Sequence, residues 1–125
     1  MNTKINIKVA FVAVARTTFF MPSAQDDFAK SCNMLEGLFN NLSKPTELLT
    51  SPEMLGEFAD TITEPDLIIY QSTTFVGGDF VTELTRRFNC PIVVWAVREP
   101  TIDGGRLKLN SLTGAFSAGN SVYLQ

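Results

Sequence analysis

Histidine is absent from this chain of 125 residues. The usual Ser–His and Cys–His nucleophilic sites therefore have no base to activate the nucleophile. The acidic residues do not replace it, because most of them fall on predicted helices and helix ends, where solvent-exposed faces are the ordinary location. They are Asp26, Asp27, Glu36, Glu47, Glu53, Glu57 and Asp60. No enzyme site can be assembled from this sequence alone.

Cysteine is scarce as well, with Cys32 and Cys90 the only two. Two thiols so far apart form neither a disulfide framework nor the close spacing of metal ligands. They agree with a reducing compartment, so we expect a cytoplasmic protein in which both are core thiols. The apolar run Val9–Ala15 after Lys8 has the look of a secretory signal, but its seven residues are short for one. A buried strand fits this run better.

Long apolar runs and clusters of positive charge are missing too. No run approaches the roughly 18 residues that cross a bilayer. The net charge is −3, and the basic residues are scattered singly except for Arg86 and Arg87. Because no basic or aromatic stripe surrounds that pair, we expect neither a nucleic-acid nor a membrane partner.

What the sequence does contain is 45% hydrophobic residues, enough for one domain with a proper core. Short apolar runs alternate with helical periods. We predict strands at residues 5–15, 46–49, 67–70 and 92–97, helices at 22–42, 52–62 and 79–88, and a brief edge strand at 107–109. This alternation predicts an α/β fold: a three-layer αβα, flavodoxin-like, doubly wound parallel sheet with strand order 2-1-3-4.

The last part of the chain differs from the rest. From residue 111 onward small residues mix with apolar ones, and no helix stop signal or polar cap follows. We therefore predict a flavodoxin-like domain over residues 1–110. Residues 111–125 are expected to begin the connection to a missing second domain, so that the chain ends at a cut.

Polar groups follow the first and third predicted strands. In an open α/β sheet the ligand crevice lies where the strand order reverses, here between these two strands. We expect Arg16, Gln71 and Thr74 to be neighbours at that point. Arg16 either binds a carboxylate, phosphate or sugar hydroxyl through its planar fork or is a solvated residue at the sheet edge. Thr74 either contacts a polar ligand or closes a turn, and Phe75 either stacks on a sugar face or covers the core.

The end of the fourth strand gives weaker signals. Trp95 continues a buried strand and is expected in the core. Arg98 and Glu99 are adjacent, and as an exposed pair they would contribute little. The glycine pairs at 77–78 and 104–105 are typical of flexible turns.

Three functions common to this fold can be tested by what they need. A flavin mononucleotide site needs free backbone donors after the first strand, where the bulky Phe19, Phe20 and Met21 stand. A phosphate-receiver domain needs an aspartate at the end of the third strand, where Gln71 stands. A phosphotransfer module needs a cysteine after the first strand, and there is none. The sequence disfavours all three.

Four stretches carry a family resemblance: VAFVAVARTTF at residues 9–19, QSTTF at 71–75, VWAVREP at 94–100 and, most specific, GGRLKLNSLTGA at 104–115. They resemble the N-terminal domain of L-fucose isomerase-like and L-arabinose isomerase-like sugar isomerases. The resemblance covers essentially the whole chain in order. The chain departs from it at Thr113, where family members often carry a cysteine, and after Ala115.

The resemblance implies an aldose–ketose isomerase that works through an enediol with a divalent metal, usually manganese. The metal ligands would lie in later domains, so this chain would hold no cofactor and no catalytic residue and would be inactive alone. It would contribute packing in a homo-oligomer. It would also contact a sugar substrate shared with a neighbouring subunit, through Arg16 and the Thr74–Phe75 loop. The alternative is a free-standing flavodoxin-like binding or assembly module without enzymatic activity.

Overall fold

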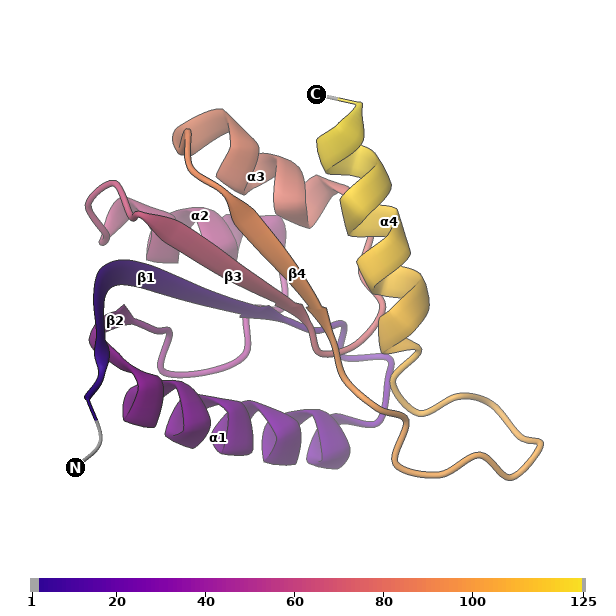
Figure 1. Cartoon of the computed structure of the whole chain (residues 1–125). Coiled ribbons are helices and arrows are strands. Elements are labelled where there is room, and N and C mark those ends of the chain that lie inside the picture. Colours follow the sequence, from indigo (N-terminus) through magenta and orange to yellow (C-terminus); the bar gives the residue numbers. More distant parts are fainter. Residues whose placement is uncertain (1–2, 125) are drawn as a thin grey trace.

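A parallel sheet of four strands in the order β2-β1-β3-β4 organises the structure (Figure 1). The computed structural model describes residues 3–124. Along the chain the elements are β1 (Ile5–Val14), α1 (Met21–Leu38), β2 (Phe39–Ser43), α2 (Pro52–Asp60), β3 (Leu67–Ser72), α3 (Asp79–Arg87), β4 (Ile92–Ala96) and α4 (Ser111–Tyr123). The predicted fold class and strand order are confirmed.

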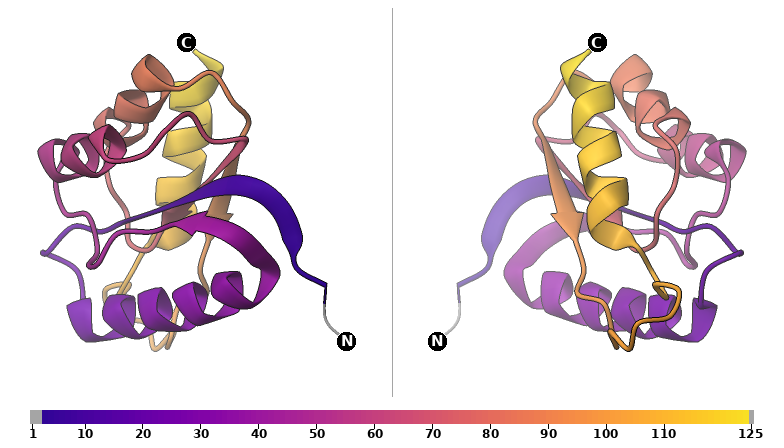
Figure 2. Two further views of the ribbon diagram at one scale, coloured as in Figure 1. Left: turned by 90° about the vertical axis from the view of Figure 1, so that its left-hand side faces the viewer. Right: turned by 90° about the vertical axis from the view of Figure 1, so that its right-hand side faces the viewer.

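The helices form the two outer layers. Helix α1 covers one face of the sheet, and α2, α3 and α4 cover the other (Figures 1 and 2). Strand β1 is enclosed between them, since residues 9–15 are at most 2% exposed. Its side chains alternate: Val9, Phe11 and Ala13 pack on the α1 side, and Ala10 and Val12 on the side of α2, α3 and α4. An unbroken apolar run is therefore what a strand covered on both faces requires.

The second strand lies earlier in the chain than the sequence predicts. Helix α1 ends at Leu38 and β2 starts at the next residue, so Leu42 pairs with Val9 in the sheet instead of extending the helix. Phe39 and Leu42 still pack against the part of the core that α1 covers. The apolar spacing of the helix therefore continues into β2, which is why the sequence predicts a longer helix. Of residues 46–49, only Leu49 joins the sheet, through an isolated bridge to Val14. The strand predicted at 46–49 is thus wrong.

Residues 111–123, expected outside the domain, form helix α4. It packs against β3, β4 and α3, with Ser111, Gly114 and Ala118 buried. The helix completes the layer above β3 and β4 (Figure 2). That this segment begins a connection to a second domain stays a prediction. The brief strand expected at 107–109 is wrong, because these residues lie in the loop between β4 and α4.

The two cysteines lie within or beside the core. Cys32 is buried on α1, and Cys90 is half-buried before β4. Burial raises the pKa of both thiols above the ordinary value of 9.0. The prediction of a core thiol is confirmed for Cys32. Over the span 3–124, no helix combines the length and the hydropathy that crossing a membrane would take.

Candidate functional site

Three loops meet at the carboxyl edge of the sheet and are joined by backbone hydrogen bonds. The loop after β1 is tied to the loop after β4, because the Phe20 N–H donates to the Lys108 carbonyl over 3.0 Å. The loop after β3 is tied to the same segment, since the Phe75 N–H donates to the Leu109 carbonyl over 2.8 Å. The two ties fix the segment 108–109 between the other two loops.

Glu99 holds this segment from its other side. Its carboxylate accepts hydrogen bonds from the backbone N–H groups of Lys108 at 3.0 Å, Leu109 at 3.1 Å and Asn110. The negative charge also lies at the N-terminus of α4, where the helix dipole stabilises it. The expectation of an exposed, weakly contributing pair with Arg98 is wrong for Glu99, which is half-buried. Sequence reasoning missed it because its partners are backbone groups nine to eleven residues away.

The start of α4 is fitted closely to the end of β3. The Ser111 hydroxyl accepts from the Val97 N–H at 2.8 Å and donates to the Ser72 carbonyl. One turn later, Gly114 leaves no room for a side chain: a Cβ there would lie 2.2 Å from the Ser72 Oγ and 3.0 Å from the Phe75 Cα. The small residue thus permits the approach that brings the β4–α4 loop over the sheet edge.

The structure brings Arg16 and Thr74 together through the backbone. The Arg16 N–H donates to the Thr74 Oγ1 over 2.7 Å, and that hydroxyl donates to the Phe75 carbonyl over 3.1 Å. Thr74 is fully buried, so its hydroxyl closes the turn. The Arg16 side chain is exposed and forms no ion pair with any carboxylate of residues 3–124.

Gln71 does not reach the surface beside Arg16. Its side chain is fully buried, its amide nitrogen donates to the Ser31 Oγ at 2.8 Å, and its amide oxygen accepts from the Thr73 Oγ1 at 2.9 Å. The amide links β3 to α1 and to the following turn. A polar residue at the end of a parallel strand gives no sequence signal that separates this role from ligand binding.

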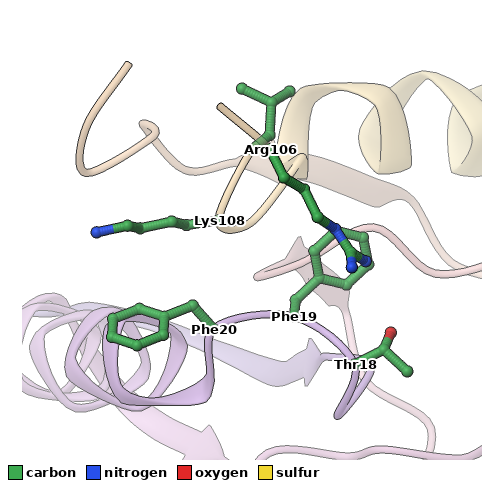
Figure 3. A pocket seen from close by; sticks show the side chains of 6 residues that line it. Thr18, Phe19, Phe20, Arg106 and Lys108 are labelled. Carbon is green, nitrogen blue, oxygen red and sulfur yellow. The ribbon is translucent and has the colours of Figure 1, made fainter. Parts of the chain in front are cut away.

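Phe75 belongs to an aromatic group at the edge. Its ring lies 6.5 Å from that of Phe19, in a tilted arrangement. Two cations cover the neighbouring rings: the Arg106 guanidinium lies 5.2 Å from the centre of Phe19, and the Lys108 ammonium 5.0 Å from that of Phe20 (Figure 3). Such cation–π contacts contribute about 0.5–1 kcal/mol each at exposed positions.

An open hollow of about 270 Å³ lies among these side chains. It is lined by Thr18, Phe19, Phe20, Arg106, Leu107 and Lys108. We call this group the aromatic–cationic hollow. Sequence reasoning did not single it out, because its residues come from two segments almost ninety positions apart that only the backbone ties bring together.

The edge is positively charged although the whole chain carries a net charge of −3. Within the described part of the chain, residues 3–124, four of its basic side chains have no ion-pair partner: Arg16, Arg98, Arg106 and Lys108. The acidic groups of the β4–α4 loop are engaged by the backbone, Glu99 as above and Asp103 by the Gly105 N–H at 3.0 Å. Unpaired cations and partly exposed rings suit an anionic ligand with an apolar face.

A divalent metal has no place among these groups. Between residues 3 and 124 there is no cluster of three or more His, Cys, Asp or Glu side chains that could hold a metal ion. The residues present therefore do not fit the metal that the resemblance implies for a whole isomerase. We derive no chemical step through a metal in this chain.

Fold and edge together define an α/β domain of the flavodoxin-like type with a cationic, aromatic edge. Over 115 residues, 92% of its length, the chain is 43% identical to a sulfoquinovose isomerase from Clostridium sp. (strain MSTE9). It is also 40% identical over 117 residues to a sulfoquinovose isomerase from Priestia megaterium (strain ATCC 12872 / QMB1551). The chain spans 26% of each relative. Neither a family model nor a solved structure matches it.

The chain is thus homologous to about a quarter of these sugar isomerases. This agrees with the resemblance to sugar isomerases in the sequence. The relatives do not show a closer kinship with L-fucose or L-arabinose isomerases.

Proposed function

We propose that this chain is the N-terminal domain of an aldose–ketose isomerase that acts on sulfoquinovose. The observation that carries the proposal is the 43% identity over 92% of the chain to a protein with that name. Sulfoquinovose is an aldohexose with a sulfonate in place of one hydroxyl, and its isomerisation moves a proton between two neighbouring carbon atoms. The proton-transfer groups and the metal, with manganese as the candidate, belong in this proposal to other parts of the protein.

The domain's own contribution is to bind and orient the sugar. Arg16 is the predicted substrate residue with an exposed, unpaired side chain, and its backbone is fixed by Thr74. Phe75 offers part of an apolar surface beside it. Gln71 and Thr74 then act indirectly, because their hydrogen bonds hold the turn after β3 that carries Phe75 and tie it to the Arg16 backbone.

Oligomer packing is the second part of the proposal, and the surface we assign to it is the outer side of α4. Leu112 is 59% exposed there and Phe116 70% exposed, four residues apart and therefore on one side of the helix. Val93 on the edge strand β4 is 48% exposed. An apolar helix face beside an open strand suits a second copy of the protein. Sedimentation of the whole protein should show a homo-oligomer that Phe116→Glu weakens.

A chimera tests the isomerase proposal. This chain replaces the matching 115-residue segment of the Clostridium relative, and the product formed from sulfoquinovose is followed by ¹³C NMR. We expect the chimera to form the ketose and the 125-residue chain alone to form none. A folded chimera that leaves sulfoquinovose unchanged, while the parent relative converts it, would contradict the proposal and favour a separate binding module.

Arg16→Ala in the chimera tests the accessory contact. Turnover should fall, whereas the melting temperature should change little because the side chain is exposed and unpaired. Lys4→Ala, an exposed cation just before β1, is the matched control. Equal losses of activity and stability would mark Arg16 as a structural residue.

A further inference from the structure

We propose that Arg106, with the Thr18 hydroxyl beside it, is the subsite that binds the sulfonate of the sugar. The inference rests on the proposed function and adds to it the group that distinguishes this sugar from an ordinary aldose. Arg106 and Thr18 both line the aromatic–cationic hollow. Figure 3 shows the Arg106 side chain reaching across Phe19 toward the loop that carries Thr18.

The chemistry of the subsite matches a sulfonate. A guanidinium presents several N–H donors in a planar fork and can bind two oxygens of a tetrahedral anion at once, and a hydroxyl can donate to the third. The Arg106 guanidinium lies over the Phe19 ring, 5.2 Å from its centre, and the Arg106 side chain is exposed. The apolar ring surface beside it suits the carbon face of a sugar.

Arg106 is free for this task. No carboxylate of residues 3–124 forms an ion pair with it, and its side chain is exposed. The loop that carries Arg106 is restricted, because the backbone two residues later is tied to Phe20 and to the Glu99 carboxylate. A restricted loop loses less conformational entropy when its arginine binds an anion.

Lys108 supplies a second positive charge without sharing the subsite. Its side chain extends over Phe20, away from Arg106 (Figure 3). It therefore acts through its field, by attracting the anion toward the edge, and this contribution falls as salt is added.

A phosphate shares the tetrahedral oxyanion chemistry, but this edge suits it less well. Phosphate sites commonly use the backbone N–H groups at a helix N-terminus. At the N-terminus of α4 the Glu99 carboxylate accepts from the N–H of the N-cap residue Asn110 and from those of Lys108 and Leu109 just before it, so a negative charge already lies at that helix end. A single guanidinium and a hydroxyl fit the monoanionic sulfonate better than a phosphate dianion.

Binding to the 125-residue chain is the first test, since it does not depend on turnover. In ¹⁵N NMR titrations, sulfoquinovose should shift the amides of residues 18–20 and 106–109, and glucose should not. Arg106→Gln should abolish the shifts, Arg106→Lys should keep part of them, and Arg86→Gln, an exposed arginine on α3, should leave them unchanged. Shifts that survive Arg106→Gln, or tighter binding of glucose 6-phosphate than of sulfoquinovose, would overturn the assignment.

Kinetics of the chimera give the second test. The sulfonate is remote from the reacting carbons and is bound alike before and during the reaction, so its loss should act on KM. Arg106→Gln should raise KM for sulfoquinovose roughly tenfold or more, with kcat nearly unchanged. An unchanged KM in an active chimera refutes the subsite alone. An inactive chimera refutes the proposed function, and the NMR titration still decides the subsite.

Discussion

Replacing Glu99 by glutamine should destabilise the protein more than the same kind of replacement at a carboxylate on the surface. The carboxylate accepts from three consecutive backbone N–H groups, those of residues 108, 109 and 110, and the last of them belongs to the N-cap residue of α4. Hydrogen bonds to a charged acceptor contribute about 1.5–3 kcal/mol each, but glutamine keeps one neutral oxygen in the same place. The net loss should therefore be about 2 kcal/mol, including the lost interaction with the helix dipole.

Urea unfolding followed by circular dichroism measures this loss. For a domain of this size, about 2 kcal/mol corresponds to a decrease of roughly 8 °C in the melting temperature. Glu57→Gln, an exposed carboxylate on α2, is the matched control and should change the free energy of unfolding by less than about 0.5 kcal/mol. If Glu99→Gln is no more destabilising than Glu57→Gln, the carboxylate does not hold the β4–α4 loop.

Four further predictions concern three core sites, Tyr70, Gly114 and Cys32. Tyr70 is fully buried, and its hydroxyl has no hydrogen-bond partner among residues 3–124. Tyr70→Phe should therefore stabilise the fold by about 1 kcal/mol, because it removes an unsatisfied polar group. Tyr123→Phe, on the surface, is the control and should not change stability. Burial raises the pKa of Tyr70 above 10.0, so the unfolded chain ionises first. The wild type should therefore lose stability above about pH 10, and Tyr70→Phe should lose less. Gly114→Ala should cost about 1–3 kcal/mol through overpacking in thermal melts, but Gly119→Ala, with open space around it, should stabilise α4. Burial raises the pKa of the Cys32 thiol and shields it from reagents. Iodoacetamide at pH 8 should therefore modify Cys32 about ten times more slowly in the folded chain than in urea. Equal rates of modification would contradict its burial.

The sheet order could be predicted because its signals are local. An apolar run such as residues 9–15 fits only a strand covered on both faces, and Ser51 followed by Pro52 marks a helix start. The structure has that start, with the Met54 N–H donating to the Ser51 Oγ over 3.1 Å. The position of β2 could not be predicted, since the apolar spacing of α1 continues into the strand without a break.

The placement of two candidate site residues, Arg16 and Thr74, could also be predicted, whereas their role in binding stays a prediction. The end of β1 identifies Arg16 as an exposed edge residue, and the strand order places it beside Thr74. Glu99 and Arg106 could not be identified, because their roles depend on a loop that returns to the sheet through backbone hydrogen bonds. Hydrogen bonds between main-chain atoms depend little on amino-acid type, so the sequence gives little sign of them.

The way the three edge loops are joined has a consequence for how such a protein diversifies. Phe20, Phe75 and the residues they meet are linked by amide and carbonyl groups that every amino acid except proline supplies. The side chains at positions such as 16, 18 and 106 can therefore be substituted without breaking the backbone hydrogen bonds that join the loops. A few substitutions at these positions can therefore change which ligand the edge accepts while the fold stays the same.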